Sequence, residues 1–587
     1  MKRTVLVGMA ILAAGCGDDP VGPGPMVEGD VASLELTPGT VQFGAVGSSS
    51  ALAAVARDAN GRLVPGAALV WSVASSGVVM VSDSGVVTST GNGTDTVRVT
   101  SGSAQALAVV TVEQSAASID LDPATFDRVG ETVALAGAVA DSNGNAVEGT
   151  SLAFASSDPS TVHVAADGLV TANYPGSAEI TVSGAGLSAM ATFTVSVAGA
   201  RLGEAVPCAG GTAAGFPCAG VELVSYLPLG ALGVSDAGAA RLNDMWGWTD
   251  PADGKEYALV ARTDGVTFVD VTDALRPRAL GYLPSPTPAS SWRDVKVYAN
   301  HAYVVADGAA GHGVQIFDLT RLRGVDVFTT FSEDGRYTGV SSVHNIAIDE
   351  ATGFAYAVGS NGGGNTCGGG LHMLDLSSPL SPAFAGCFAD DNTGRAGSGY
   401  THDVQCVVYA GPDATYAGRE ICVGSNETAI SIADVTDKNA AVALSTGTYP
   451  DARYVHQGWL TEDHRYFIQN DELDELEGVA PFTRMLVWDV TDLDDPILVA
   501  EHPGPTGAID HNVYIRDGIA YQSNYQFGIR FVDLSTPASP VEAGFFDTYP
   551  ENDARGFSGS WSNYPFFDSG IVVVTSAEEG LFVLRRP

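Results

Sequence analysis

Four histidines recur at matching positions in the second half of this 587-residue chain, and their type and spacing suit them to chemistry. Each is the first member of a polar pair that opens a short apolar segment. The four are His344, His402, His456 and His511. Neutral imidazole is a common ligand of iron, copper and zinc. If the side chains converge, the pattern predicts a transition-metal site.

The histidine pairs belong to a repeat of roughly 50–58 residues that occurs seven times after residue 240. The seven opening pairs are Asn243-Asp244, Arg293-Asp294, His344-Asn345, His402-Asp403, His456-Gln457, His511-Asn512 and Ser562-Asn563. About 20–30 residues later, each repeat has a second strand such as VTFVDV or VQIFDL. A repeat of this length built only from strands is typical of a β-propeller, with one blade per repeat. The innermost strands of a propeller line its axis, so we expect a polar ring there, completed by Asn243 and Arg293.

Two interpretations of this ring stay open. Repeated polar residues at strand starts also hold neighbouring blades together by hydrogen bonds. Because strand side chains alternate, a shift of one residue would turn Asn345, Asp403, Gln457 and Asn512 inward instead. The metal interpretation predicts a four-histidine axial site, which would resemble the iron centre of carotenoid-cleaving oxygenases in geometry alone.

Carboxylates and aromatic residues add further candidates. The acidic run from Asn470 to Glu475 and the isolated Glu427 could bind calcium or support the histidines, although a solvated loop is the favoured interpretation. Five aromatic residues are expected either at the mouth of the axial channel or in packing between blades. They are Trp246, Trp248, Trp292, Trp459 and Tyr525.

The N-terminal residues MKRTVLVGMAILAAGC predict an export signal. LAAGC resembles a bacterial lipobox, which implies cleavage after residue 15 and lipidation of Cys16; an ordinary secretory signal is the alternative. The apolar run is too short to span a bilayer, so the lipid would be the only membrane attachment. Residues 16–30 are rich in Pro, Gly and acid and predict a flexible tether.

Six further cysteines, an even number in an exported chain, predict disulfides. Fifteen pairings are open to six cysteines. Local order favours Cys208–Cys218, Cys367–Cys387 and Cys406–Cys422. A zinc site is the weaker alternative, because the spacings lack a CxxC pattern.

Residues 31–114 and 115–198 both predict antiparallel sandwiches, with short alternating strands and frequent turns. The stretches VWSVASSGVVMVSDSGVVTSTGNGTDTVRVT and AFASSDPSTVHVAADGLVTANYPGSAEITVS resemble bacterial Ig-like group 2 domains. This resemblance implies spacers or adhesion modules. The runs DANGR and DSNGN are interpreted as hairpin turns rather than calcium loops.

Residues 199–587 form the predicted propeller, and the unpaired strand 221–229 is expected to complete the last blade and so close the ring. The stretches VHNIAIDEATGFAYAVGSN, VHQGWLTEDHRYFIQNDELDE and IDHNVYIRDGIAYQSNY resemble the LVIVD-repeat surface proteins, also called the choice-of-anchor B family. The resemblance implies an exported, surface-held protein and leaves its biochemical activity open.

Composition narrows the functional classes. A net charge of −40 argues against nucleic-acid binding, which needs basic clusters. No GxSxG elbow or P-loop occurs in the sequence. We therefore expect an all-β, exported lipoprotein of the cell envelope whose propeller binds an extracellular protein, glycan or small ligand. The alternative is a metal-dependent, possibly redox, enzyme that uses the four histidines.

Overall fold

The structure is a computed structural model that describes residues 30–135, 137–235, 240–364 and 366–586. The predicted signal (1–15), Cys16 and the tether up to residue 29 lie outside the described residues. Strands dominate, and the described helical segments are short 3-10 turns: η1 (Leu229–Leu232), η2 (Leu319–Leu322) and η3 (Cys367–Gly369). One compact unit comprises the described parts of Met1–Asp120, Gly137–Leu152 and Ser183–Ala189. The other comprises those of Leu121–Ala136, Ala153–Val182 and Met190–Pro587.

Two successive groups of nine strands share one pairing order. The first group is β1 (Ser33–Thr37), β2 (Thr40–Phe43), β3 (Ser49–Ala51), β4 (Ala53–Arg57), β5 (Val70–Val73), β6 (Val79–Val81), β7 (Val86–Ser89), β8 (Gly93–Ser101) and β9 (Ala104–Val112). The second is β10 (Ser118–Asp120), β11 (Ala124–Phe126), β12 (Thr132–Ala134), β13 (Ala138–Ala140), β14 (Ala153–Ser156), β15 (Val162–Val164), β16 (Leu169–Ala172), β17 (Gly176–Gly184) and β18 (Leu187–Val195). The order β2-β9-β8-β5 in one group matches β11-β18-β17-β14 in the other, and β3-β7-β6 matches β12-β16-β15.

In each group the two larger sheets share one apolar core. Alternation explains this in β8, where Val97 and Val99 are fully buried and Arg98 between them is exposed. Val97 shares its core with Val87 of β7, which belongs to the other sheet. Phe193 of β18 and Val170 of β16 share the second core in the same way. In each group, two sheets therefore pack face to face on a shared core. The expected purely antiparallel pairing is wrong, because β2 pairs with β9, and β11 with β18, in parallel.

The described residues from 206 to 585 contain seven sheets of four or more strands. Their strands, in pairing order, are β23 (Leu242–Thr249), β24 (Glu256–Arg262), β25 (Gly265–Asp270), β26 (Arg278–Pro284) and β30 (Thr329–Thr330) in sheet 1; β27 (Arg293–Tyr298), β28 (His301–Ala306), β29 (Val314–Asp318) and β31 (Gly335–Tyr337) in sheet 2; β33 (Asn345–Asp349), β34 (Phe354–Val358), β36 (Leu371–Asp375) and β37 (Ala383–Phe388) in sheet 3; and β38 (Asp403–Val408), β39 (Glu420–Ser425), β40 (Ile430–Asp434) and β41 (Val442–Gly447) in sheet 4.

Sheet 5 consists of β42 (Val455–Leu460), β43 (Tyr466–Asp471), β44 (Arg484–Asp489) and β45 (Ile497–Pro503). Sheet 6 consists of β46 (Val513–Arg516), β47 (Ile519–Ser523), β48 (Ile529–Asp533) and β49 (Val541–Phe546), extended by β21 (Phe216–Ala219) and β20 (Thr212–Ala213). Sheet 7 consists of β50 (Ser560–Tyr564), β51 (Ile571–Ser576), β52 (Gly580–Arg585), β22 (Glu222–Pro228) and β19 (Val206–Pro207). A small separate pair joins β32 (Val340–Ser342), which precedes sheet 3 in the sequence, to β35 (Asn361–Gly364), which lies between β34 and β36.

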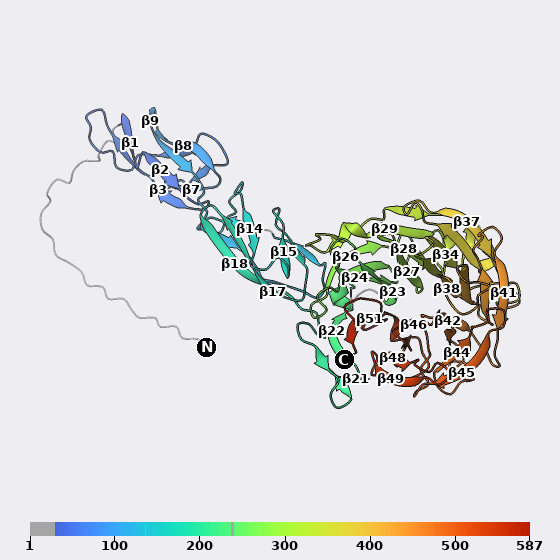
Figure 1. The fold of residues 1–587 in the computed structure, drawn as a ribbon. Coiled ribbons are helices and arrows are strands. Elements are labelled where there is room, and N and C mark those ends of the chain that lie inside the picture. The colour runs from blue at the N-terminus through green and yellow to red at the C-terminus, as the bar shows by residue number, and fades with distance from the viewer. Residues whose placement is uncertain (1–29, 136, 236–239, 365, 587) are drawn as a thin grey trace, which may run out of the picture. The chain divides into compact units, whose positions relative to one another are not determined.

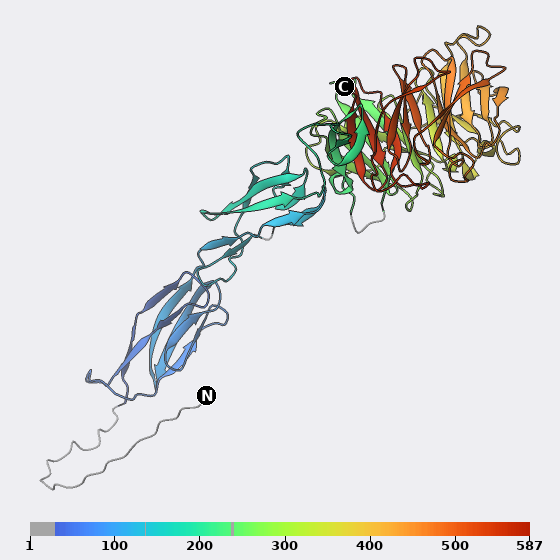
Figure 2. The same cartoon turned by 90° about the horizontal axis from the view of Figure 1, so that it is seen from below.

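The sheets are arranged in a ring, which makes this unit a β-propeller (Figure 1), and Figure 2 shows the ring from the side. The first strands of successive sheets lie side by side, and β23 of sheet 1 contacts both β27 of sheet 2 and β50 of sheet 7. The Thr575 hydroxyl donates to the Asn243 carbonyl, at 2.8 Å, across this junction. The ring is therefore closed by direct contact between its first and last sheets.

An N-terminal strand completes the last sheet, as predicted. β22 pairs antiparallel with β52, with Leu227 opposite Leu581. Both leucines are buried in a core that also contains Val260 of sheet 1. Because the strand comes from the beginning of the propeller and β52 from its end, the pairing ties the two ends together and covers a sheet edge.

The three predicted disulfides are present: Cys208–Cys218, Cys367–Cys387 and Cys406–Cys422. The last joins directly opposite residues of β38 and β39. These six sulfurs are therefore not zinc ligands. Disulfides persist in oxidising compartments, and the three bonds indicate an exported protein. In the described part of the chain, no helix has the length and apolarity to cross a bilayer.

Candidate functional site: a histidine-lined cavity on the propeller axis

The four repeated histidines lie next to one another on the inner strands of sheets 3 to 6. Ring centroids are 4.2 Å apart for His344 and His402, 4.2 Å for His402 and His456, and 4.4 Å for His456 and His511. All four line one cavity of about 230 Å³, which we call the axial cavity. The repeat thus places matching residues of consecutive sheets around the axis.

Hydrogen bonds set the orientation of three of these rings, whereas Nδ1 of His456 is buried and has no hydrogen-bond partner among the described residues. Nδ1 of His402 lies 2.8 Å from the His456 carbonyl oxygen, and Nδ1 of His511 lies 2.6 Å from the carbonyl oxygen of Trp561. A carbonyl oxygen only accepts, so Nδ1 carries the proton in both rings and Nε2 keeps its lone pair. His344 places Nδ1 3.0 Å from the Asp307 carboxylate. Such partners on Nδ1 are typical of metal-ligating histidines.

Burial keeps three of the rings neutral. It lowers the pKa of His402 and of His456 well below the usual value, and it lowers the pKa of His511 to about 3. Neighbouring imidazoles lower these pKa values further. At neutral pH the rings therefore have the uncharged form that binds metal ions.

Glu472 brings a carboxylate to two of these histidines. Its Oε2 lies 3.7 Å from Nε2 of His456, and its Oε1 lies 3.7 Å from Nε2 of His511. The Tyr525 hydroxyl donates to Glu472 Oε1 at 2.8 Å. Burial raises the pKa of Glu472 to about 7. One donor atom from each of Glu472, His456 and His511 lies within 4.8 Å of the others, which is the arrangement of a metal-ligand set.

Aromatic side chains form much of the remaining wall of the axial cavity. Tyr525 and Trp561 contact the His511 ring at centroid distances of 4.6 and 5.0 Å. Tyr454 lies edge-on to His402 at 5.1 Å. These rings exclude water around the histidines, which explains their depressed pKa values.

The predicted position of the polar pair in the seventh repeat is wrong by one residue. The predicted pair Ser562-Asn563 is displaced by one residue, because Trp561 and Ser562 occupy the places that His511 and Asn512 occupy in sheet 6. Trp561 lines the axial cavity, and Ser562 accepts from the Asn512 side-chain amide at 3.2 Å. The segment Ser560-Trp561-Ser562-Asn563 contains three small polar residues, so the repeat spacing alone does not determine which two positions match the pair.

The second members of the pairs form the next layer along the axis and connect the inner strands. Asp294 accepts from the Ile346 backbone amide at 2.9 Å, and Gln457 accepts from the Val513 amide at 2.7 Å. Asn512 donates to Asp244 at 3.2 Å. Lys296 pairs with Asp294 at 2.5 Å within this layer. The structural interpretation of the repeated polar residues therefore fits this second layer, although Asp244, Asn345 and Asn512 also line the axial cavity.

The two other predicted ring members have partners outside the histidine set. The Arg293 guanidinium donates to the Arg262 carbonyl at 2.9 Å and to Ser285 Oγ at 2.9 Å, and its Nη1 lies 2.7 Å from His312 Nε2. The Asn243 side-chain amide donates to the Ser291 carbonyl at 2.8 Å. Asn243 lines a second cavity of about 460 Å³, which shares Trp292, Glu472, Tyr525 and Trp561 with the axial cavity.

The five predicted channel aromatics separate into three groups. Trp292 and Tyr525 line the axial cavity. Trp246 and Trp459 line a different small cavity of about 70 Å³, beside Lys296 and Asp403. The expectation of a channel position is wrong for Trp248, which is 4% exposed and stacks on Tyr257 at 5.1 Å in the apolar core between sheets 1 and 2.

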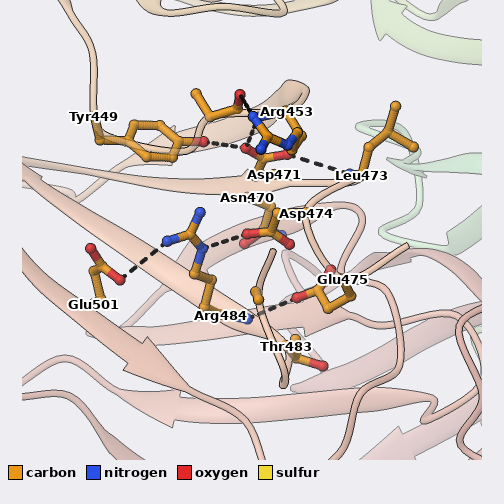
Figure 3. A network of polar contacts seen from close by, with 12 residues as sticks. Tyr449, Arg453, Asn470, Asp471, Leu473, Asp474, Glu475, Thr483, Arg484 and Glu501 are labelled. Atoms are coloured by element: carbon orange, nitrogen blue, oxygen red, sulfur yellow. Dashed lines mark hydrogen bonds and ion pairs between the residues drawn. The ribbon is translucent and has the colours of Figure 1, made fainter. Parts of the chain in front are cut away.

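The acidic run is buried, so the expectation of a solvated loop is wrong. Asp471 accepts hydrogen bonds from the Tyr449 hydroxyl at 2.6 Å and from the Tyr454 backbone amide at 2.7 Å. Asp474 pairs with Nε of Arg484 (Figure 3). Arg484 lies ten residues beyond Asp474, and only the fold shows that the two side chains meet. Glu427, by contrast, accepts from the Arg395 backbone amide at 3.0 Å near a turn.

No protein-family model matches this chain, and a search of curated proteins finds no match. Among solved structures, a protein of Lactobacillus plantarum is similar to 57% of this chain over 88% of its own length, with 13% identity and a TM-score of 0.38. The Cps50 (Swd1) β-propeller domain of Myceliophteria thermophila is similar to 59% of this chain over 97% of its length, with 11% identity and a TM-score of 0.39. Likenesses this weak carry no argument about function, which has to come from the site.

Proposed function

We propose that this protein is an exported binding protein whose propeller holds a divalent transition metal in the axial cavity, with His456, His511 and Glu472 as ligands. The observation that carries the proposal is the convergence of two neutral imidazole Nε2 atoms and one carboxylate in a cavity that polar and aromatic side chains line together. Two imidazoles and one carboxylate with open positions suit iron, and the same donors suit copper and zinc.

The three-residue set leaves coordination positions open toward His402 and His344. A small extracellular ligand of a few atoms would bind there, because the cavity volume is about 230 Å³. This choice narrows the earlier expectation of a protein, glycan or small-ligand partner. Tyr525 orients Glu472 by its hydrogen bond, and the Trp561 carbonyl orients His511.

The second candidate function is a metal-dependent, possibly redox, enzyme. The open positions beside the three ligands favour it, because a catalytic metal site keeps room for substrate. A metal-loaded protein that binds a ligand without turning it over supports the binding function, and multiple turnovers support the enzyme.

We also infer the following architecture. Each of the seven sheets is one blade of a seven-bladed propeller of the LVIVD type (residues 199–587). Residues 31–114 and 115–198 are Ig-like group 2 spacers, and Cys16 carries the lipid that holds the protein at the cell envelope. The shared strand order of the two sandwiches supports the spacers. Mass spectrometry of the membrane fraction tests the lipid, which Cys16→Ser should abolish.

The metal is tested by incubating the purified protein separately with Fe²⁺, Cu²⁺ and Zn²⁺, removing unbound ion and measuring metal by elemental analysis. We expect close to one ion per chain, lost in His456→Ala and in His511→Ala. His301→Ala is the matched control, since His301 begins β28 and its Nδ1 contacts the Ala299 carbonyl at 2.7 Å. Absence of stoichiometric metal in all three incubations overturns the proposal.

A further inference from the structure

A second, chemically different site lies beside the axial cavity. Asp474 and Glu475 follow β43, and Asp510 immediately precedes His511. All three carboxylates are 0% exposed, and one oxygen from each lies within 4.8 Å of the others. We call them the carboxylate cluster. Acidic side chains are almost never fully buried unless they are paired, so each oxygen needs a partner.

Hydrogen bonds from the protein satisfy only some of the oxygens of the carboxylate cluster. Nε of Arg484 bonds Oδ2 of Asp474, and the Arg484 backbone amide donates to Oε1 of Glu475 at 3.2 Å (Figure 3). Four oxygens of the carboxylate cluster are buried and have no hydrogen-bond partner among the described residues: Asp474 Oδ1, Glu475 Oε2, and both oxygens of Asp510. Asp510 is thus a fully buried side chain whose two oxygens, beside the other carboxylates, lack any donor.

The charge of the carboxylate cluster, like its unpartnered oxygens, indicates that the site suits a cation. Once all three are ionised, as binding of a cation requires, the three carboxylates carry three negative charges, and Arg484 supplies one positive charge, part of which it shares with Glu501 at 3.3 Å. Two negative charges remain to be balanced in a buried volume, which is the charge of one divalent cation.

We propose that the carboxylate cluster binds one Ca²⁺ ion. Calcium takes about 6–8 oxygen ligands in flexible geometry, and the four unpartnered carboxylate oxygens supply the core of such a set. Magnesium keeps several of its waters and suits a fully buried site less well. The all-oxygen donor set also distinguishes this site from the imidazole-containing set in the axial cavity.

The position of the ion gives it a supporting role. Asp474 and Glu475 belong to the connection between β43 and β44 in sheet 5, whereas Asp510 belongs to the segment that leads into β46 of sheet 6. Calcium therefore ties two neighbouring sheets together. It also fixes the chain beside Glu472 and His511, the two residues that contact each other in the axial cavity.

The test uses the full chain, freed of metal with EGTA, and thermal unfolding with added Ca²⁺ or Mg²⁺. We expect 1 mM free Ca²⁺ to raise Tm by roughly 2–5 °C and Mg²⁺ to raise it much less. Elemental analysis should find one Ca²⁺ per chain after gel filtration. His456→Ala should keep the calcium response, so that failure of the transition-metal proposal is separable from failure of this one.

The Asp510→Asn variant distinguishes two ways in which the negative charge of the cluster could be balanced: by a bound Ca²⁺ ion or by protons shared among the carboxylates. If calcium binds there, the variant should lose the rise in Tm that Ca²⁺ produces in wild type. Asp494→Asn, in an exposed acidic group, is the control and should keep the response. If Asp510→Asn does not fold, displacement of Tb³⁺ from wild type by Ca²⁺ gives the stoichiometry. Wild type without bound Ca²⁺, or a variant with an undiminished response, overturns the proposal.

Discussion

The Nδ1 atom of His511 lies 2.6 Å from the carbonyl oxygen of Trp561, a residue of the next sheet around the ring. His402 makes the matching contact with the His456 carbonyl at 2.8 Å. The orientation of a histidine in one sheet is thus set by the backbone of its neighbour. The axial cavity therefore depends on ring closure as well as on its own side chains.

Tyr525→Phe should weaken binding of the transition metal by about 10–100-fold, because the hydroxyl that orients Glu472 is lost while the ring is kept. Titration calorimetry with the ion that the wild type retains measures the change. Tyr521→Phe, at a buried tyrosine in the core of sheets 6 and 7, is the control. An unchanged affinity in Tyr525→Phe would show that Glu472 does not bind the ion.

The contribution of Asp547 to stability should fall as pH rises from about 4 to 7, whereas the depressed pKa values of His402, His456 and His511 act in the opposite direction below pH 6.5. Burial raises the pKa of Asp547 from 3.8 to about 7, and nearby carboxylates add to the effect. At Asp547 the folded state then binds more protons than the unfolded state in this window, so its contribution to the free energy of unfolding decreases with pH by at most about 1.4 kcal/mol per pH unit. Above pH 7 this contribution is fully lost. Burial raises the pKa of Glu579 to about 7 as well, which gives the same sign.

Asp547→Asn should remove this contribution to the pH slope, since an amide oxygen still accepts from the Tyr549 backbone amide, now 2.8 Å from Asp547 Oδ1. Urea unfolding at pH 5, 6, 7 and 8 measures it. Asp568→Asn, at a side chain that is 96% exposed, is the control. A variant whose slope equals that of wild type would show that Asp547 does not titrate in this range.

Phe268→Ala should destabilise the propeller by about 3–5 kcal/mol. Phe268 is 0% exposed, stacks on Phe317 at 4.7 Å and meets Phe331 edge-on at 5.8 Å. Truncation leaves a cavity between sheets 1 and 2 that rigid strands cannot fill. Phe384→Ala, at a phenylalanine that is 46% exposed, should cost much less. Equal losses of unfolding free energy in the two variants would contradict this account.

Sequence patterns predicted features that depend on repetition or on local order. The repeat spacing placed His344, His402, His456 and His511 at equivalent positions, and strand 221–229 lacked a local partner, which indicated closure. Features that depend on a single neighbour were not predictable. The burial of Asp474 depends on Arg484, and the identity of Trp561 as the ring member depends on a contact with His511. Trp248 and Trp292 have the same residue type, and only packing places one in the core and the other at the cavity.

Replacing Cys406 and Cys422 together by Ser should lower the free energy of unfolding by about 3 kcal/mol, the cost expected for releasing a short closed loop. The two cysteines are 16 residues apart and lie opposite each other in β38 and β39. β38 follows directly after His402, whose Nδ1 lies 2.8 Å from the carbonyl oxygen of the proposed ligand His456, so the change also loosens a contact that positions this ligand. The Cys208/Cys218 double variant, in which the bond lies outside the inner strands, is the comparison.

We expect both double variants to lose stability, but only the Cys406/Cys422 variant to bind the transition metal more weakly. Equal metal affinity in the two would show that β38 keeps His402 in place without the bond, or that His402 contributes nothing to binding.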